Sequence, residues 1–285
     1  KIVMIGAGNV ATNIVKTLAN IGETPVQIWS RTLASAETLA NAVGTCATSD
    51  WDSVVKDADV YIVAVKDDAM LNVIDLLCAH CKHGVFVHTA GTMSMSMFTG
   101  KAEHYGVLYP MQTFSKQKEV DFRTVPCFVE ASDKHTLDII MELARLLSDN
   151  VRELAESERK WLHIAAVFSC NFANVCNAMA AQILERHGLS FDVMLPLLDE
   201  TVAKLHRLHP REAQTGPASR GDVGVVSKHL AMLEDNKELF AVSQPGIGAV
   251  WIVGIPFTKV SVEVSPPGLV KMTSQASISS ETCLV

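Results

Sequence analysis

The chain has 285 residues, of which 48% are hydrophobic and 19% are charged, and its formal net charge is −7. This composition is typical of a globular protein with a hydrophobic core, and it excludes a disordered or collagen-like chain. The acidic excess disfavours binding to nucleic acid or to an anionic membrane surface. No stretch of about 18 uninterrupted apolar residues occurs, so no membrane-spanning helix is predicted.

The start of the chain and its cysteines predict a cytoplasmic protein. The first residues, KIVMIGAGNVA, lack the hydrophobic region and cleavage site of a signal peptide. Seven widely spread cysteines favour free thiols over a disulfide framework. The segment Cys78–His83 holds two cysteines and two histidines, but no second ligand pair completes a zinc site, so no metal is predicted.

Strand and helix patterns alternate through residues 1–153. Short apolar runs predict strands at 2–5, 25–29, 60–65, 85–87, 107–109, 127–129 and 151–154. Apolar residues at helical spacing predict helices at 9–20, 35–43, 69–77 and 133–147. Strands that alternate with helices predict an α/β fold in which a doubly wound parallel sheet has helices on both faces.

The pattern changes after residue 153. One long helical pattern covers 157–187, and further helices are predicted at 191–208 and 223–239. Residues 154–240 are therefore predicted to form an all-α domain. Residues 241–285 are rich in Ser, Pro and Gly, with interrupted strand-like content at 252–264. This atypical segment fits a flexible tail, an edge strand or an arm on a partner subunit, and the tail is favoured.

A glycine-rich turn joins the first strand to the first helix. Residues 6–11 have the pattern G-x-G-x-x-A, in which Gly6 permits the tight turn and Gly8 lets a pyrophosphate approach the backbone. The free N–H groups at the start of the helix, including those of Asn9 and Val10, would hold that pyrophosphate. The alternative is a turn that only joins strand to helix. The context favours a dinucleotide site.

The end of the second strand indicates which dinucleotide binds. An NAD enzyme usually places an acidic residue there to hold the ribose 2′-OH. This chain has Ser30, Arg31 and Thr32 instead. A guanidinium flanked by two hydroxyls suits the 2′-phosphate of NADP. The alternative is a solvated surface arginine.

Two further strand ends are predicted to face the same crevice, because ligands bind at the carboxyl ends of parallel strands. Val65 and Asp67 follow one strand, although Asp67 and Asp68 could equally cap the next helix. Thr89, Ala90 and Gly91 follow the other strand, where Gly91 allows close approach to the nicotinamide half. His88 ends that strand and is interpreted as structural rather than catalytic.

Polar residues on the long helix are candidates for substrate binding. His163, Cys170, Asn171 and Asn174 fall on one face at regular helical spacing, within a helix that its apolar residues predict to be mostly buried. They would contact either a substrate or neighbouring helices.

Two features of the following segments can likewise be interpreted as either functional or structural. Glu200 and Lys204 form an ordinary i,i+4 pair, unless Lys204 is buried and donates a proton. The polar loop at 214–222 is either an anion clamp or helix-capping punctuation.

The chain resembles the Rossmann-like NADP oxidoreductases that carry the C-terminal domain of unknown function 2520. The resemblance covers about residues 1–235, and the segments that carry it are GAGNVA, DADVYIVAVKDDA, VHTAGT, YPMQTFSK, LHIAAVFSCNFAN, LLDETVAK and QTGPASRGD. The layout is similar to pyrroline-5-carboxylate reductase and the 6-phosphogluconate dehydrogenase-like group. The resemblance implies a Rossmann domain followed by an all-α domain of that group's type, a homodimer formed by the helical domain, and an active site between the domains.

One departure limits what the resemblance implies. Related β-hydroxyacid and ketopantoate enzymes have a lysine four residues before an asparagine on the long helix, whereas here Val167 precedes Asn171 and Cys170 precedes Asn174. Their mechanism therefore cannot be transferred.

We expect an NADP-dependent oxidoreductase that acts on a small carbonyl or imine. His163 or Lys204 would supply the proton, and Asn171 and Asn174 would orient the substrate. The alternatives are an NADP-binding regulatory or scaffold protein without turnover and, more weakly, a reductase with a deazaflavin partner.

Overall fold

The computed structural model describes the chain except residues 119, 218, 234–259, 266–268 and 275–285. For the strand residues 260–265 and 269–274 it describes only the secondary structure. The chain divides into two units, Lys1–Asn174 and Val175–Val285. Each unit is described by itself.

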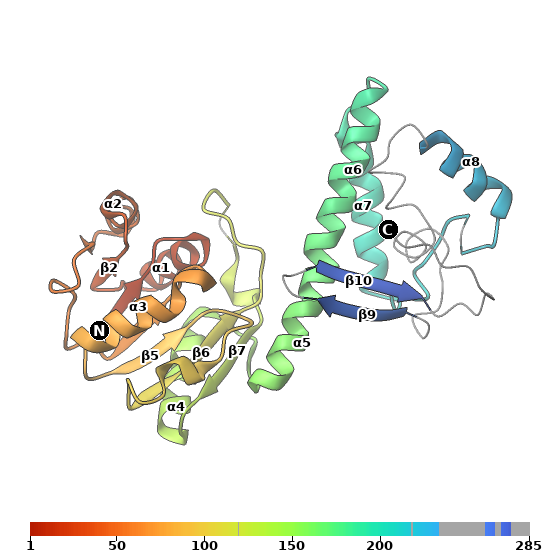
Figure 1. Ribbon diagram of the computed structural model, residues 1–285. Coiled ribbons are helices and arrows are strands. Elements are labelled where there is room, and N and C mark those ends of the chain that lie inside the picture. The colour runs from red at the N-terminus through yellow and green to blue at the C-terminus, as the bar shows by residue number, and fades with distance from the viewer. Residues whose placement is uncertain (119, 218, 234–259, 266–268, 275–285) are drawn as a thin grey trace. The chain divides into compact units, whose positions relative to one another are not determined.

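An eight-stranded sheet with the order β3-β2-β1-β4-β5-β6-β7-β8 forms the centre of the first unit (Figure 1). All neighbouring strands are parallel except β6 and β7, which are antiparallel. The order of β1–β6 is that of a Rossmann fold, which confirms the predicted fold class. The strands are β1 (Ile2–Ile5), β2 (Gln27–Trp29), β3 (Cys46–Thr48), β4 (Val60–Val63), β5 (Val85–His88), β6 (His104–Pro110), β7 (Cys127–Ala131) and β8 (Val151–Glu153).

Helices cover both faces of this sheet because alternate strand residues point to opposite sides. Met4 and Ile62 pack with α1, α2 and α4 in one core cluster, whereas Ile5 and Val63 pack with α3 in the other. The helices are α1 (Asn9–Asn20), α2 (Leu33–Val43), α3 (Asp67–His80) and α4 (Lys134–Leu147), with short 3₁₀ helices at Met95–Phe98 and Phe122–Thr124.

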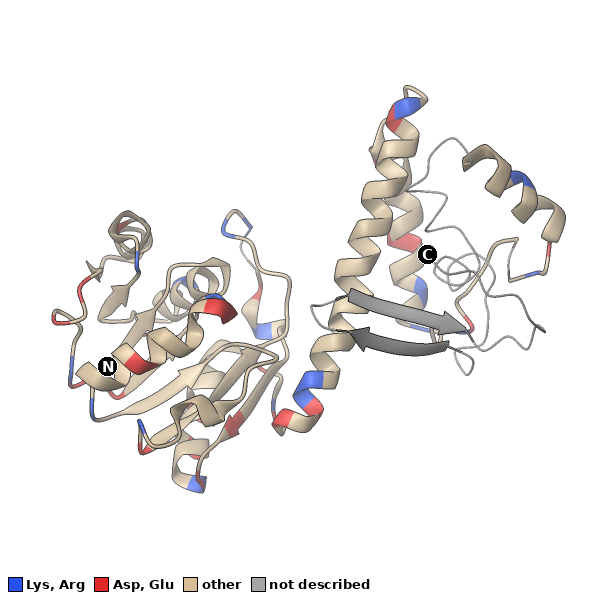
Figure 2. Cartoon of the chain, viewed as in Figure 1, with Lys and Arg blue, Asp and Glu red and all other residues tan. Residues whose placement is uncertain are grey.

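A continuous helical segment from Glu156 to Arg186 follows β8. It consists of α5 (Glu156–Ala166), a π-helical turn η3 (Val167–Phe172) and α6 (Ala173–Arg186). Residues 161–184 contain no Lys, Arg, Asp or Glu, and Figure 2 shows charged residues only towards the two ends of this segment. The boundary predicted at residue 153 follows the last strand, whereas the two units divide at Asn174 within this helical segment.

Two expectations about this helix need correction. It has 31 residues, and an 18-residue stretch within it has a mean hydropathy of 1.4, so by length and composition alone it is long and apolar enough to cross a membrane. Counting only uninterrupted apolar runs overlooked this, although the core helix of a soluble protein passes the same criterion. The predicted burial is also wrong, because Arg159 is the only buried residue of the whole segment, all of whose residues the structure describes. Apolar composition indicated that the helix needs a partner, but not that the chain itself supplies one.

The second unit continues with a short 3₁₀ helix at Phe191–Met194 and α7 (Leu195–Leu205). After a loop, α8 (Val223–Leu233) begins where the Asp222 carboxylate accepts a hydrogen bond from the Val225 N–H at 3.4 Å. This contact supports the capping interpretation of the loop. The remainder of the predicted 223–239 helix lies outside the described residues. Strands β9 (Val260–Ser265) and β10 (Leu269–Ser274) pair antiparallel, so the predicted tail contains strands.

Candidate functional site

The carboxyl ends of the four central strands lie side by side. Ile5, the last residue of β1, pairs with Trp29 of β2 and Val63 of β4, and Val63 pairs with His88 of β5. The predicted cofactor residues follow directly after these strand ends. The topology therefore brings the glycine turn and the segments at 30–32, 65–67 and 89–91 to one edge of the sheet, as the sequence predicted.

The glycine turn has the shape that a diphosphate requires. Gly6 has φ +126°, and a Cβ at this position would lie 2.3 Å from the Ala64 carbonyl oxygen, so the turn fits only glycine. A Cβ on Gly8 would meet no atom within 4 Å, which leaves space for a ligand to approach the backbone. The Asn9 side chain instead donates to the Phe114 carbonyl at 3.1 Å. This contact leaves the Asn9 backbone N–H available for the predicted binding of the pyrophosphate.

The helices that begin at this edge have N-termini without a side-chain cap. In α1, α2 and α3 the residue before the helix makes no side-chain capping hydrogen bond. By contrast, the Asp133 carboxylate caps α4 by accepting from the Thr136 N–H at 2.9 Å. Uncapped helix N-termini carry unpaired N–H groups and the positive end of the helix dipole, both of which favour an anion.

The segment after β2 suits a phosphate. Arg31 and Thr32 are exposed, Ser30 is half-buried, and Thr32 directly precedes α2. The Ser30 backbone N–H donates to the Thr48 carbonyl oxygen at 3.1 Å, which fixes the start of the segment. This bond does not involve the Ser30 side chain. This short segment supplies two hydroxyls, a guanidinium and a helix N-terminus, which are groups that fit the 2′-phosphate of NADP.

The ends of β4 and β5 are joined across the crevice. The Thr92 hydroxyl donates to the Asp67 carboxylate at 3.2 Å, and Val65 lies against the Gly6 turn. Asp67 lies in the first turn of α3, and Lys66 occupies the N-cap position, so neither predicted aspartate is the capping residue. These contacts fix the loop 89–93 relative to the start of α3.

His88 is structural, as interpreted from the sequence. It is fully buried, and its Nδ1 accepts a hydrogen bond from the Ala90 N–H at 3.2 Å. Burial first, and the Arg159 charge second, lower the pKa of His88 to about 3. The ring is therefore neutral at physiological pH and holds the turn that leads into the predicted nicotinamide loop.

Arg159 contacts the predicted nicotinamide loop, a contact that the sequence analysis did not predict. Its side chain is fully buried, and Nη1 donates to the carbonyl oxygens of Ala90, Gly91 and Met93 at 2.9–3.1 Å. Nη2 donates to the Glu130 carboxylate at 3.0 Å, which also accepts from the Glu156 N–H. A buried charge requires such compensation. Arg159 therefore ties the start of α5 to the loop after β5.

A second missed residue, Tyr109, lies beside the predicted His163. The Tyr109 hydroxyl and His163 Nδ1 are hydrogen-bonded across 3.0 Å. A Cβ on Gly91 would lie 2.6 Å from His163 Nδ1 and 2.9 Å from Tyr109 Cζ, so both side chains pack directly on the loop after β5. The YPMQTFSK segment that carries the resemblance begins at Tyr109, but nothing in its local pattern indicates a contact 54 residues away.

A hollow of about 380 Å³ opens beside this pair. The lining residues that the structure describes include no Asp, Glu, Lys or Arg, and they come from the end of β6, the segment after it, α5 and the π-helical turn. A π-helical turn is frequent at functional sites, because the extra residue changes which side chains share a face. The lining residues are Tyr109, Met111, Gln112, Thr113, Leu162, His163, Ala165, Ala166, Val167, Ser169, Cys170 and Asn171.

Only part of the predicted polar stripe reaches this hollow. His163, Cys170 and Asn171 line it, whereas Asn174 is exposed on α6 and is not among the lining residues. Regular helical spacing grouped all four, but the π-helical turn shifts the register between His163 and Asn174. Lys204 lies half-buried on α7 in the second unit and forms no ion pair there with the exposed Glu200.

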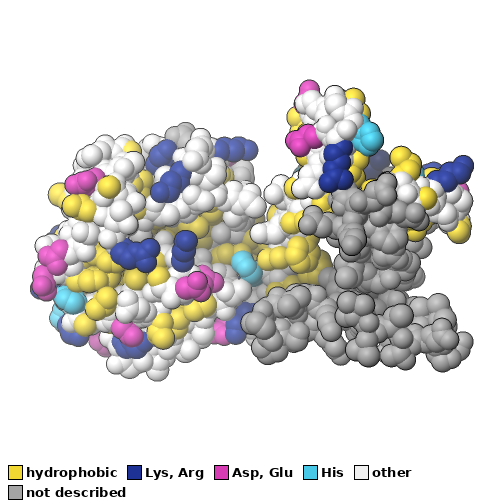
Figure 3. All heavy atoms as spheres, turned by 45° about the horizontal axis from the view of Figure 1, so that its top comes forward, with side chains coloured by type: hydrophobic (Ala, Val, Ile, Leu, Met, Phe, Trp, Pro, Cys, Tyr) yellow, Lys and Arg dark blue, Asp and Glu magenta, His cyan; other side chains and the backbone are white. Residues whose placement is uncertain are grey.

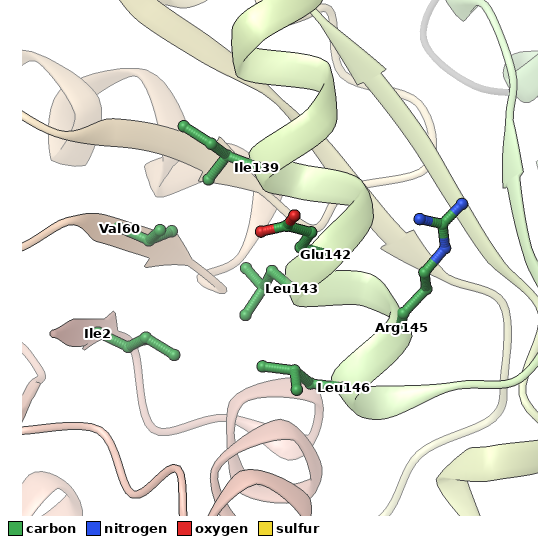
Figure 4. A pocket seen from close by; sticks show the side chains of 7 residues that line it. All are labelled: Ile2, Val60, Ile139, Glu142, Leu143, Arg145 and Leu146. Carbon is green, nitrogen blue, oxygen red and sulfur yellow. The ribbon is translucent and has the colours of Figure 1, made fainter.

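A hollow of about 490 Å³ lies elsewhere on the first unit and differs in character (Figure 4). Ile2 and Val60 at the amino ends of β1 and β4 line it, together with side chains of α4. Figure 4 shows the Arg145 guanidinium pointing away from the other lining side chains. This shallow, mainly apolar surface lies at the opposite edge of the sheet from the glycine turn, so it is not part of the candidate site.

Comparisons with known proteins identify the family to which the chain belongs. Residues 1–90 match a family described as NADP oxidoreductase, coenzyme F420-dependent, and residues 125–244 match a domain of unknown function, DUF2520. No curated protein sequence matches the chain. A crystal structure from Bacteroides fragilis, described as an NADP oxidoreductase, is 46% identical with a TM-score of 0.81, and the match covers 85% of this chain and 93% of that one.

More distant structures share the fold. Pyrroline-5-carboxylate reductase from Coxiella burnetii is 21% identical with a TM-score of 0.56, covering 84% of this chain and 93% of that one. An imine reductase from Myxococcus stipitatus, solved in complex with NADP+, is 17% identical with a TM-score of 0.62, covering 89% and 96%. The chain therefore belongs to the family of Rossmann-type NADP oxidoreductases that carry the DUF2520 domain, and its cofactor is NADP.

Proposed function

We propose that this protein reduces a small carbonyl or imine with NADPH, at the edge of the sheet where the glycine turn and the Tyr109–His163 pair lie. The observation that carries the proposal is the position of Gly91. The loop expected to hold the nicotinamide half packs directly on a polar pair that borders an uncharged hollow. A hydride acceptor must lie beside the nicotinamide and near a proton source.

NADPH supplies the hydride when it is bound, and the chain's own residues hold it. The backbone at Gly6, Gly8, Asn9 and Val10 would bind the pyrophosphate, and Ser30, Arg31 and Thr32 would bind the 2′-phosphate. Val65, Asp67, Thr89, Ala90 and Gly91 would border the nicotinamide half. Of the predicted residues, His163 and Asn171 line the hollow, so His163 is the candidate proton source and Asn171 is the candidate for orienting the substrate.

The role of Arg31 is tested by fluorescence titration with NADPH and NADH. A hydrogen bond to a charged group contributes about 1.5–3 kcal/mol, so Arg31→Glu should weaken NADPH binding about 10- to 100-fold while NADH binding changes little. Arg145→Glu is the matched control, because it makes the same charge change on an exposed arginine at the opposite edge of the sheet. An equal loss for both cofactors would refute the 2′-phosphate assignment.

Turnover is tested by following NADPH absorbance with neutral ketones, aldehydes and cyclic imines. Oxidation of NADPH by any of them supports the proposal. Binding of NADPH without oxidation across the whole panel would instead favour a regulatory or scaffold protein. Oxidation only after a deazaflavin is added would assign the chain to a deazaflavin-linked reaction, which the family description of residues 1–90 names.

We further propose a homodimer formed by the helical region. Trp161 is 72% exposed and Val175 is 50% exposed on a helix whose residues 161–184 carry no charge. Figure 3 shows apolar side chains at the surface in the region of this helix. Exposed apolar surface of this kind marks an association site. Sedimentation velocity should show a dimer that Val175→Glu converts to a monomer.

The cysteines support a reducing compartment such as the cytoplasm. Six of the seven lie in the described part of the chain, and all six are free thiols. Cys78 and Cys81 are buried in the α3 core, and burial raises the pKa of Cys78 to about 11. These two thiols therefore pack as apolar side chains.

A further inference from the structure

We propose that Tyr109 is the catalytic residue that donates the proton to the reduced substrate, and that His163 positions Tyr109 and resupplies its proton. The inference rests on the proposed function and deepens it. The sequence alone suggested His163 or Lys204 as the direct donor, but the structure places a buried phenol beside the His163 imidazole, at the wall of the same hollow.

The first argument is position. Tyr109 is 8% exposed and lies near the end of β6, the strand next to β5, whose following loop contains Gly91. The Tyr109 ring and the His163 ring both contact that loop, which is expected to border the nicotinamide half. A donor at Tyr109 is therefore adjacent both to the expected cofactor loop and to the hollow that would hold the substrate.

The second argument is that the pair is held rigidly. Arg159, one helical turn before His163, binds three carbonyl oxygens of the loop 90–93 and the Glu130 carboxylate. These bonds fix α5, and thus His163, relative to β7 and to the loop after β5. Positioning of this kind is what proton transfer to a reacting atom requires.

The third argument is the chemistry of the lining. Among the lining residues that the structure describes there is no aspartate, glutamate, lysine or arginine. Burial raises the pKa of Tyr109, and the Arg159 charge opposes that shift only partly, so the phenol remains protonated at neutral pH. The Cys170 thiol also lines the hollow, but Tyr109 and His163 are the lining residues shown to pack on the loop that contains Gly91, so they are the candidate proton donors.

The proton moves in a balanced sequence. Hydride addition to the carbon of a C=O group, or of a C=N group that is not already protonated, breaks the π bond and leaves its electron pair on oxygen or nitrogen. That atom takes the Tyr109 hydroxyl proton as the phenolic oxygen receives a proton from His163 Nδ1. At the same time Nε2 of His163, a half-buried residue, takes a proton from water, so that no imidazolate forms and hydroxide leaves to the solvent. Proton exchange with water then returns the ring proton to Nδ1. The sequence requires neutral His163 to carry its proton on Nδ1, because only then does the Tyr109 hydroxyl hydrogen remain free for the substrate.

The tautomer provides a test that needs no substrate. In the full-length protein labelled with ¹⁵N-histidine, we expect the His163 ring to show a protonated Nδ1 and an unprotonated Nε2, with His163→Asn used to assign the signals. Tyr109→Phe removes the acceptor and should change this pattern. Tyr105→Phe is the matched control, because its phenol is on the same strand but bonds Thr99. A wild-type ring protonated on Nε2, with Nδ1 accepting from Tyr109, would overturn the proposal.

The second test uses cyclohexanone and 2-methyl-1-pyrroline, a cyclic imine. Tyr109→Phe should lower kcat on the ketone by about 100-fold or more, the usual range for a general acid, with the Kd for NADPH within threefold. The loss on the imine should be smaller than tenfold, because its iminium form already carries the proton. An equal loss on both probes, or none on the ketone, would overturn the donor role.

The two proposals fail in different ways. A wild-type protein that reduces neither probe nor any other member of the panel would overturn the proposed function, and the donor role with it. A wild-type protein that reduces the ketone as fast as its Tyr109→Phe variant would overturn the donor role alone.

Discussion

The Rossmann sheet and the helix Glu156–Arg186 differ in where their apolar residues find partners. Every residue of β4 and β5 is buried within the first unit, whereas in the long helix Arg159 alone is buried. Similar apolar runs are therefore buried in the sheet and exposed in the long helix. Apolar composition indicates that a segment needs to be covered, but only the fold determines whether the same chain covers it.

The largest loss of stability is expected for a substitution in the glycine turn of the Rossmann sheet. Gly6→Ala should lower the free energy of unfolding by about 4 kcal/mol, from a close contact with the Ala64 carbonyl and from backbone strain. Gly22→Ala, also at positive φ but with no atom within 4 Å of the new Cβ, should cost only about 1 kcal/mol. Urea denaturation measures both, and equal losses would contradict the steric explanation.

Core truncation tests the two regions directly. Leu18→Ala removes a fully buried side chain of α1 and should cost about 3 kcal/mol. Val175→Ala on the long helix, where the side chain is 50% exposed, should cost less than about 0.5 kcal/mol in dilute monomer. The second loss should grow with protein concentration if a second copy covers the helix. A loss that is independent of concentration would argue against that interface.

A pH titration tests the burial of the sheet edge. The folded pKa of His88, about 3, lies below the unfolded value near 6.5, so its contribution to stability is fully present above pH 6.5 and is lost as the pH falls. Between pH 7 and pH 5 the loss should be about 2 kcal/mol. Urea denaturation of His88→Gln should lack this component. If the two proteins had the same pH slope, His88 would not be buried in its neutral form.

The smallest expected effect separates capped from uncapped helices. Asp133→Ala removes the cap of α4 and should cost about 1 kcal/mol of stability without changing NADPH affinity. Thr32→Ala, before α2, removes no side-chain cap and should change stability little while weakening NADPH binding. Thermal denaturation should detect a loss of stability only in Asp133→Ala, and NADPH titration should detect a loss of affinity only in Thr32→Ala. A loss of both properties in both variants would contradict this distinction.

The sequence predicted the parts of the fold that depend on local pattern. Buried parallel strands such as β1 and β4 are continuous apolar runs, and the glycine turn has a recognisable spacing. β3 was missed because it is a three-residue edge strand that starts with an exposed cysteine. The first half of β6 was missed because His104, Tyr105 and Gly106 do not form an apolar run.

The candidate site was only half predictable. The cofactor edge follows from strand ends and could be located residue by residue. The Tyr109–His163 contact and the Arg159 clamp depend on how α5 returns to the sheet, which no local spacing encodes. The predicted stripe failed at Asn174 because it assumed a regular helix, and nothing in VFSCNF indicates a π-helical turn.

The π-helical turn also determines the direction in which every later side chain of the helix points. A regular helix advances about 100° per residue, so one surplus residue between Val167 and Phe172 rotates the later part of the helix by that angle relative to an uninterrupted one. Deleting a single residue there would restore regular winding and would redirect every later side chain of the helix. A change of one codon would then alter which residues are available to a second subunit, while the strands before it kept their positions.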